Sequence, residues 1–251
     1  MNNQKSKLII IAIFIAGLVI GFSFHGMITL WFQNSSVHEK PLDERYQEAI
    51  KDAMVAEKNE VYNNLVPIVE TNTNLSWQGE PGNKSVLVVA FTKFTSSYPV
   101  NESVTTRWGY TWVTVSPEIK TFFKNDVDRN SNFSLRVKQL LGLPEDNDNS
   151  YFVELWVKPE SLFRPSPDNE INDTTAQLTF PDSTDPDYKK WFNDNIIYSY
   201  FPVRYPWTRL GYTYDWGNPN SEIGLSEFVI KINSTVVVKS VTPINDYLIR
   251  G

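Results

Sequence analysis

The chain contains 251 residues, of which 29 are acidic, 23 are basic and none is cysteine, and its formal net charge is −6. The acidic balance disfavours nucleic acid and anionic lipid headgroups as partners, because both are themselves negative. Without cysteine there is no disulfide framework, no thiolate nucleophile and no cysteine-ligated metal. The only histidines, His25 and His38, precede the expected globular part, so a Ser-His-Asp or histidine-rich zinc site is excluded there, and we expect no cofactor.

An uncharged apolar segment runs from residue 8 to residue 32. At about 1.5 Å per residue, a helix of this length exceeds the roughly 30 Å hydrocarbon core of a bilayer. Lys5 and Lys7 precede it, so the positive-inside rule predicts a cytoplasmic N-terminus and an extracytoplasmic remainder. A cleaved signal peptide is the alternative, but the apolar run is too long and no small-residue cleavage motif follows it closely. We therefore predict that residues 1–33 form a cytoplasmic tip and a single-pass plasma-membrane signal-anchor.

Asn-x-Ser/Thr sequons are more frequent than chance predicts. Seven of them lie beyond the anchor, whereas this composition would give roughly three or four by chance. One interpretation is a glycosylated surface protein, and the other is an Asn-rich chain that produces sequons freely. The asparagines are Asn34, Asn74, Asn83, Asn101, Asn132, Asn172 and Asn233.

Residues 34–70 are predicted to form a helical stalk or the first helix of the domain. Apolar residues recur near helical spacing between Pro41 and Glu70, with charges between them. Residues 71–84, rich in Asn, Thr and Gly, break the pattern and are the best candidate for a linker. We therefore expect the globular domain to span residues 71–251.

Regular strand and helix signals begin after residue 84. Residues 85–94 are β-branched and residues 104–115 alternate between two faces, so both are predicted strands. Ser116 followed by Pro is typical of a helix start, and a second helix is predicted over residues 133–141. Residues 151–157 return to a strand pattern.

The last third of the chain predicts one helix followed by strands. Asp185-Pro186 has the residues of a helix start, and residues 208–216, 226–232 and 235–241 are predicted strands separated by turn-forming residues, which suggests an antiparallel meander. No repeat or βαβ rhythm is present. The predicted fold class is therefore α+β, with a mixed or antiparallel sheet and several short helices behind one N-terminal transmembrane helix.

The densest aromatic segment spans residues 205–217. Strand alternation would place Trp207, Arg209 and Asp215 on one face. If that face borders a groove, Trp207 supplies a stacking surface and an Arg209–Asp215 pair supplies fixed hydrogen bonds, a combination that suits a carbohydrate or a peptide. The alternative is an aromatic-rich sheet whose Arg and Asp pair for structural reasons.

A proline-bounded loop gathers Asp168, Glu170 and Asp173, whose oxygens are of the kind that calcium prefers. Their spacing does not match an EF-hand, and acidic loops are usually just solvated. We therefore predict no metal site, with these three residues as the only candidates for one.

Catalysis without histidine or cysteine would depend on carboxylates. Glu154 shares a strand face with Phe152 and Trp156, an apolar setting expected to raise its pKa. Glu222 and Glu227 lie just before and within a late strand. A glycosidase would need two carboxylates facing one cleft, here two of Glu154, Asp215, Glu222 and Glu227, and ordinary half-exposed strand glutamates are the alternative.

Four segments carry a family resemblance: WVTVSPEIKTFF, LLGLPEDNDNSYFVELWVKPESLFRPSPDNEI, YPWTRLGYTYDWGNPNSEIGLSEFVI and VTPINDY. They resemble a family of uncharacterised prokaryotic proteins over about residues 85–247. In that family, cysteines stand at the positions of Ser166 and Ala176, which implies a loop bridge that this chain lacks. The family has no assigned activity, so the resemblance implies no function.

A second likeness is to the ADP-ribosyltransferases. Glu227 near a late strand and Arg107 near an early one are similar to the catalytic Glu and the Arg of that family, but its Ser-Thr-Ser motif is missing here. The missing catalytic residue types favour a non-catalytic extracytoplasmic domain that binds a ligand or an envelope component through its aromatic face. The alternative is a carboxylate-dependent extracytoplasmic enzyme, either a glycosidase or an ADP-ribosyltransferase-like protein.

Overall fold

The computed structural model describes residues 40–125, 132–202 and 204–249. Residues 42–251 form one compact unit, so the segment before residue 71 belongs to the globular part. The predicted transmembrane span at residues 8–32 and the sequon at Asn34 lie outside the described residues. Within the described ranges, no helix is both long and apolar enough to cross a bilayer.

The first helix is shorter than its sequence pattern predicts. Helix α2 (Leu42–Ala53) is followed by a 3₁₀ turn, η1 (Lys58–Glu60), and then by extended chain. In this extended segment, hydrogen bonds to distant residues take the place of helical ones. For example, the Leu65 N–H donates to the Thr174 carbonyl at 2.9 Å. The apolar spacing that predicted a longer helix reflects burial of this extended segment, because Leu65 and Ile68 lie in the core although neither is helical.

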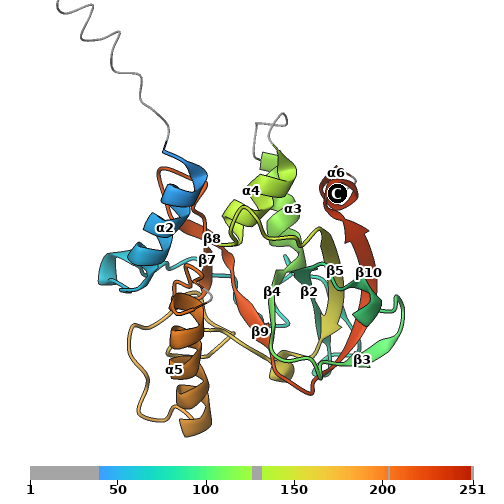
Figure 1. Cartoon of the computed structure of the whole chain (residues 1–251). Coiled ribbons are helices and arrows are strands. Elements are labelled where there is room, and N and C mark those ends of the chain that lie inside the picture. The colour runs from blue at the N-terminus through green and yellow to red at the C-terminus, as the bar shows by residue number, and fades with distance from the viewer. Residues whose placement is uncertain (1–39, 126–131, 203, 250–251) are drawn as a thin grey trace, which may run out of the picture. The chain divides into compact units, whose positions relative to one another are not determined.

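The core of the unit is an eight-stranded sheet with the order β3-β10-β5-β2-β4-β9-β6, in which β1 pairs with β2 beside this path (Figure 1). Every strand pair in the described part of the chain is antiparallel. A separate hairpin joins β7 (Tyr212–Tyr214) to β8 (Ile223–Ser226). The sheet strands are β1 (Trp77–Gln78), β2 (Ser85–Thr92), β3 (Ser103–Thr105), β4 (Thr111–Val115), β5 (Tyr151–Val157), β6 (Leu162–Phe163), β9 (Phe228–Ile230) and β10 (Thr235–Pro243).

Helices cover one face of this sheet. Helices α3 (Ser116–Asn125), α4 (Phe133–Leu140) and α6 (Ile244–Ile249) pack over Val89 of β2 and Phe152 of β5. Helix α5 (Pro186–Tyr200) lies beside the hairpin with α2, and these two helices share a smaller core (Figure 1). Two short 3₁₀ turns, η2 (Thr95–Ser97) and η3 (Pro159–Ser161), complete the elements of the described chain.

The predicted α+β class with a mostly antiparallel sheet is confirmed, but two strand predictions are wrong. The predicted strand over residues 104–115 is split into β3 and β4, because the buried Thr106 hydroxyl donates to the Lys231 carbonyl and turns the chain. The predicted meander does not form either. After the β7–β8 hairpin, β9 inserts between β4 and β6, and β10 inserts between β3 and β5.

Candidate ligand-binding site

The chain changes its strand partners at Glu227. Just before it, Ser226 of β8 pairs with Tyr212 in the hairpin, and just after it, Phe228 of β9 pairs with Val113 in the large sheet. The Glu227 N–H itself donates to the Gly211 carbonyl at 2.9 Å. Glu227 therefore lies at the junction of the two sheets, where its side chain can point into the space between them.

Gly211 fits this junction because no larger residue can occupy its position. Its φ is +76°, in the left-handed region, and a Cβ added there would lie 2.6 Å from Cδ of Arg164. Arg164 is fully buried and donates to Asp173 and to the Thr175 carbonyl, so it has little room to move. The close approach holds the Gly211 carbonyl opposite the Glu227 N–H.

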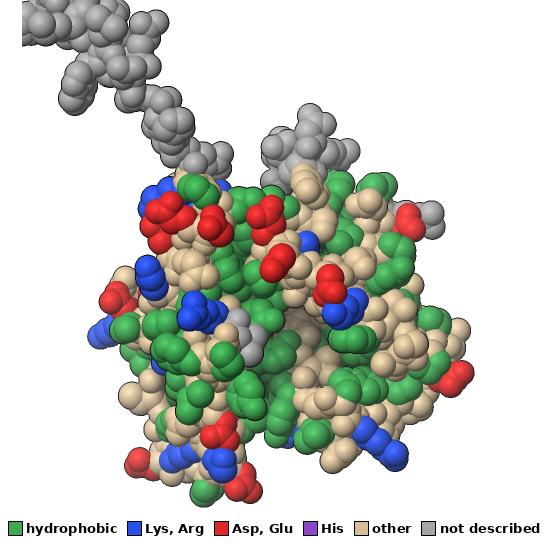
Figure 2. Space-filling view, in the orientation of Figure 1, with side chains coloured by type: hydrophobic (Ala, Val, Ile, Leu, Met, Phe, Trp, Pro, Cys, Tyr) green, Lys and Arg blue, Asp and Glu red, His purple; other side chains and the backbone are tan. Residues whose placement is uncertain are grey.

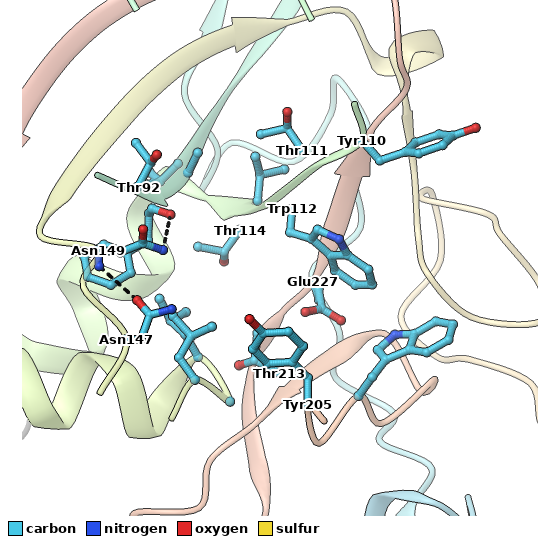
Figure 3. A pocket seen from close by; sticks show the side chains of 18 of the residues that line it. Thr92, Tyr110, Thr111, Trp112, Thr114, Asn147, Asn149, Tyr205, Thr213 and Glu227 are labelled. Atoms are coloured by element: carbon cyan, nitrogen blue, oxygen red, sulfur yellow. Dashed lines mark hydrogen bonds between the residues drawn. The ribbon is translucent and has the colours of Figure 1, made fainter. Parts of the chain in front are cut away.

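A pocket of about 760 Å³ opens between the hairpin side and the large sheet. Figure 2 shows the face of the molecule hollowed at its centre, with mostly hydrophobic side chains around the hollow. In Figure 3, the Glu227 carboxyl group lies between the side chains of Trp112 and Tyr205. Among the described residues that line the pocket, Glu227 is the only acidic or basic one. The aromatic residues of the lining are Phe91, Phe94, Tyr98, Trp108, Tyr110, Trp112, Phe152, Tyr198, Tyr205, Trp207, Tyr212 and Tyr214.

Unpaired polar atoms concentrate in this pocket. In the described part of the chain, five buried side-chain nitrogen or oxygen atoms lack a hydrogen-bond partner, and three of them belong to pocket residues: Oε2 of Glu227, Nε1 of Trp207 and Nδ2 of Asn195. Such atoms are rare in native proteins because each one costs free energy when it is removed from water without a partner. Three side chains with such atoms therefore line one cavity, although the atoms themselves are closed to solvent, which makes this cavity the strongest candidate site of the described chain.

Burial determines the protonation state of Glu227. Its position deep in the molecule raises its pKa to about 8, and part of its surface still borders the pocket. The carboxyl group is therefore mostly protonated at neutral pH, when it can both donate and accept a hydrogen bond. A carboxyl with a strongly raised pKa inside a cavity is typical of functional sites.

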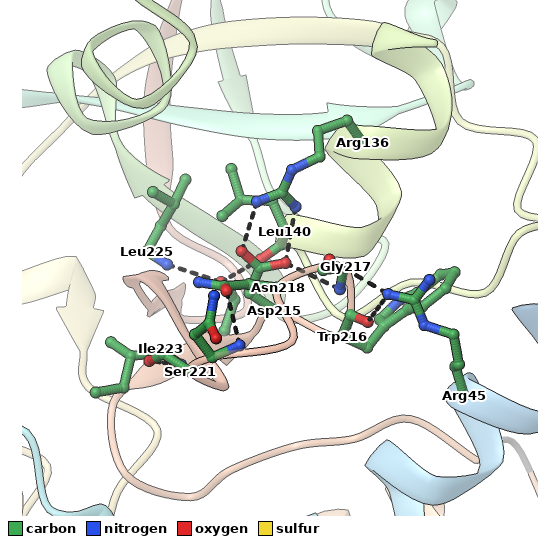
Figure 4. Close-up of polar contacts among 12 residues, drawn as sticks. Arg45, Arg136, Leu140, Asp215, Trp216, Gly217, Asn218, Ser221, Ile223 and Leu225 are labelled. Atoms are coloured by element: carbon green, nitrogen blue, oxygen red, sulfur yellow. Dashed lines mark hydrogen bonds and ion pairs between the residues drawn. The ribbon is translucent and has the colours of Figure 1, made fainter. Parts of the chain in front are cut away.

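Of the three predicted binding residues, only Trp207 lines the pocket. Asp215 is 1% exposed and forms a bidentate pair with Arg136 of α4, with both N–O distances at 2.7 Å (Figure 4). Arg209 instead donates to the carbonyls of Ala53 and Met54 at the end of α2, where a cation is stabilised by the helix dipole. The expected Arg209–Asp215 pair is therefore wrong, and both side chains stabilise the fold.

The predicted carboxylates lie apart. Glu154 is buried under α3 and α6, where it accepts hydrogen bonds from Ser240 and Tyr247 and pairs with Lys239 at 3.0 Å. Burial acts to raise its pKa, but Lys239 and Ser240 outweigh that effect and hold the pKa below its ordinary value, so the expected increase is wrong. Glu222 is half-buried and is not among the described residues of the Glu227 pocket. No second candidate carboxylate therefore joins Glu227 there.

The predicted acidic loop is organised by internal contacts. Asp173 pairs with Arg164, and Asp168 accepts a hydrogen bond from the Gln177 N–H at 2.8 Å, whereas Glu170 is exposed. In the described ranges, no group of three or more potential metal-ligating side chains comes together. Arg107, the residue suggested by the ADP-ribosyltransferase likeness, is exposed and is not among the described lining residues either.

A second and more open hollow contains Glu118, which sequence analysis did not single out. Its carboxylate accepts hydrogen bonds from the N–H and the hydroxyl of Ser226 and from the Thr114 hydroxyl. Burial raises its pKa to about 7, against the opposite effect of these bonds. Since protein groups already satisfy its oxygens, Glu118 connects α3 to β8 and is a weaker site candidate than Glu227.

The sequon asparagines of the described chain are separate from the pocket lining. All six sequon asparagines within the described ranges are exposed, and none of them lines the Glu227 pocket. Trp112 and Asn195 line the pocket although neither is among the predicted site residues. The alternation of residues 104–115 was a usable signal for Trp112, whereas Asn195 lies in a helix with no distinguishing pattern.

Comparison with known proteins adds no relative: no protein-family model, no curated protein and no solved structure matches this chain. The resemblance to uncharacterised prokaryotic proteins stays a prediction.

Proposed function

We propose that residues 42–251 form an extracytoplasmic domain that binds a neutral, hydroxyl-rich ligand of the carbohydrate class in the Glu227 pocket. The observation that carries the proposal is that Glu227, Trp207 and Asn195, each with an unpaired buried polar atom, all line one aromatic cavity. A small rotation of these side chains towards a bound ligand would give the three atoms the partners that they lack, and this would favour binding.

The chemistry of these atoms favours hydroxyl groups. The indole of Trp207 and the amide nitrogen of Asn195 are donors and need acceptors on the ligand, while Glu227 can donate or accept. An ammonium ion has no acceptor to offer, and an anion would meet no cation among the described lining residues. A peptide would bring charged groups for which that lining offers only Glu227. A sugar hydroxyl donates and accepts, so it suits all three atoms.

The pocket walls fit the apolar part of a sugar. The C–H face of a sugar ring packs against aromatic side chains. Trp112 and Tyr205 lie on either side of the Glu227 carboxyl group, and Trp207 is a further aromatic residue of the lining. A volume of about 760 Å³ lies within the roughly 300–1,000 Å³ range of small-molecule pockets. An apolar cavity with a few polar groups is the usual arrangement of such sites.

The proposed binding can be tested by a substitution that removes the polar group of Glu227 but keeps the bulk of its side chain. Glu227→Leu should weaken binding of a neutral sugar by about tenfold or more, since a lost hydrogen bond in a dry pocket costs about 1.5 kcal/mol. Glu227→Gln, which can still donate and accept, should keep most of the affinity. The measurement is isothermal titration, or quenching of tryptophan fluorescence, with a panel of neutral sugars built from glucose, galactose, mannose and N-acetylglucosamine.

Glu222→Leu is the matched control, because the same substitution is made five residues away at a side chain outside the described pocket lining. It should bind as the wild type does. Equal affinity of the Glu227→Leu variant and the wild type, or no binding of any sugar in the panel, would overturn the proposal.

The proposed location depends on residues 8–32 serving as the membrane anchor. With Lys5 and Lys7 on the cytoplasmic side, a protease added to intact cells or spheroplasts should digest the chain beyond Asn34. Immunoblotting against a C-terminal tag measures this. Full protection of the tag in intact cells, with digestion only after lysis, would contradict the proposed orientation.

An enzyme that cleaves or transfers a glycosyl group is the second candidate, and the raised pKa of Glu227 favours it, because a protonated carboxyl is the form that acts as a general acid. A paired-carboxylate mechanism needs a second acid, which the described lining does not supply. The two candidate functions can be distinguished by whether the protein cleaves a bound oligosaccharide. New reducing ends formed from a bound oligosaccharide by the wild type, but not by Glu227→Gln, would identify the enzyme.

A further inference from the structure

One wall of the Glu227 pocket is built from three aromatic side chains whose exposure increases from Trp207 through Trp112 to Tyr110. Trp207 is 5% exposed, Trp112 is half-buried and Tyr110 is 42% exposed, and all three line the pocket. Trp207 and Trp112 have ring centroids 5.9 Å apart. Trp191 of α5 contacts all three, with centroids at 5.4 Å from Tyr110 and 6.3 Å from Trp112 and from Trp207.

This arrangement holds the wall in place before any ligand arrives. Each of the three rings packs against Trp191 in a tilted or edge-to-face geometry, which is favourable between aromatic rings. Rings that are fixed in advance lose little side-chain entropy when a ligand binds. The wall therefore offers fixed stacking surfaces at successive depths.

The mouth of the pocket is also aromatic. Trp108 and Tyr198 line it although they are 47% and 64% exposed. The indole nitrogen of Trp108 donates to the Thr111 hydroxyl at 3.1 Å, and its ring packs edge-on against buried Tyr98 at 5.2 Å, so the exposed ring has a fixed orientation. Exposed aromatic side chains grouped around a cavity are typical of binding surfaces.

We propose that the pocket binds the end of a chain of linked sugar units rather than a single sugar. The terminal unit occupies the interior at Glu227, Trp207 and Asn195, and the following units stack on Tyr110, Trp108 and Tyr198 at the mouth. A pocket of about 760 Å³ has room for more than one ring, and the 5.9 Å between the ring centroids of Trp112 and Trp207 is comparable to the length of one unit in a linked chain. This inference rests on the proposed carbohydrate function and specifies the length and polarity of the ligand.

The test compares monosaccharides with their linear trisaccharides on the full-length protein in detergent. The probes are glucose, galactose, mannose and N-acetylglucosamine, each with a linear trisaccharide of the same unit. Adenosine is added as a neutral ligand that is not a chain of sugar units. For the preferred sugar, the trisaccharide should bind at least tenfold more tightly than the monosaccharide. Trp108→Ala and Tyr198→Ala should each weaken trisaccharide binding about five- to tenfold, which corresponds to about 1–1.4 kcal/mol for the loss of one stacked ring, and should leave monosaccharide binding unchanged.

Ile197→Ala is the matched control, since Ile197 is 61% exposed on the same helix as Tyr198 but does not line the pocket. It should change neither affinity. Equal affinities for the monosaccharide and the trisaccharide, both lost in Glu227→Leu, would overturn this inference and leave the proposed function standing. Binding of adenosine alone, or of no probe, would overturn both.

Discussion

Asp215→Ala is expected to lower the free energy of unfolding by about 3 kcal/mol or more. The Asp215 carboxylate is 1% exposed, and the Arg136 side chain that it pairs with is only 16% exposed. Two N–O contacts of 2.7 Å, and a third hydrogen bond from the Gly217 N–H, join β7 to α4 and to the turn that follows. Removal of the carboxylate would leave a poorly solvated guanidinium without this partner. Urea unfolding followed by tryptophan fluorescence measures the loss.

Asp194→Ala provides the control for this prediction. Asp194 pairs with Lys190 at 2.6 Å, but the two side chains are 53% and 73% exposed, so this change should cost no more than about 0.5 kcal/mol. A double-mutant cycle with Arg136→Met and Asp215→Ala should give a coupling of about 1–3 kcal/mol. A loss below about 1 kcal/mol in Asp215→Ala would mean that the pair is not a stabilising contact, and would return Asp215 to the candidates for ligand binding.

The local sequence correctly predicts those strands and helices whose ends are determined by neighbouring residues. Strand β5 occupies Tyr151–Val157, as its β-branched and aromatic pattern indicates. Helix α5 begins at Pro186, after Asp185 accepts hydrogen bonds from the N–H groups of Asp187 and Tyr188. An N-cap followed by proline encodes a helix start within a few residues, so tertiary structure is not needed to recognise it.

The aromatic segment at residues 205–217 shows where local reasoning stops. Alternation places side chains on defined faces only if the backbone is extended, but Arg209 has a φ of 60° and Gly211 a φ of 76°, so the chain turns twice before β7 begins at Tyr212. The turns send Arg209 to the end of α2 and Asp215 to α4. These partners lie 155 and 79 residues away in sequence, and no local pattern encodes such distant contacts.

Sequence alone could name the acidic candidates but could not rank them. Glu154 and Glu227 both lie in apolar surroundings along the chain, and they differ only in what the fold brings near them. Glu154 meets Lys239 and the hydroxyls of Ser240 and Tyr247, whereas Oε2 of Glu227 meets no partner in the described chain. The partner change between β8 and β9 creates this difference, and it arises from long-range strand pairing.

Ionisation of Glu227 should lower the stability of the protein as the pH rises. Its pKa is about 8 in the folded chain and about 4.5 in the unfolded chain, so between these values the folded state holds more protons. The contribution of Glu227 to stability should therefore be greatest below about pH 4.5. It should fall as the pH rises through about 8, and level off above that. The physical cause is the ionised carboxylate, which loses hydration and has no partner for Oε2.

Glu227→Gln removes this titration while it keeps the shape of the side chain, so the variant should gain stability relative to the wild type as the pH rises from 5 to 9. We expect a relative gain of about 1–3 kcal/mol, which is less than the full shift implies, because the part of the side chain that borders the pocket is screened by solvent. Glu118 also titrates near this range, but it is present in both proteins and its contribution cancels in the difference. Urea unfolding of the two proteins at pH 5, 7 and 9 provides the measurement. A difference that stays constant across these pH values would show that Glu227 ionises at an ordinary pKa, and the carboxyl group would then enter ligand binding as a charged acceptor and not as a neutral donor.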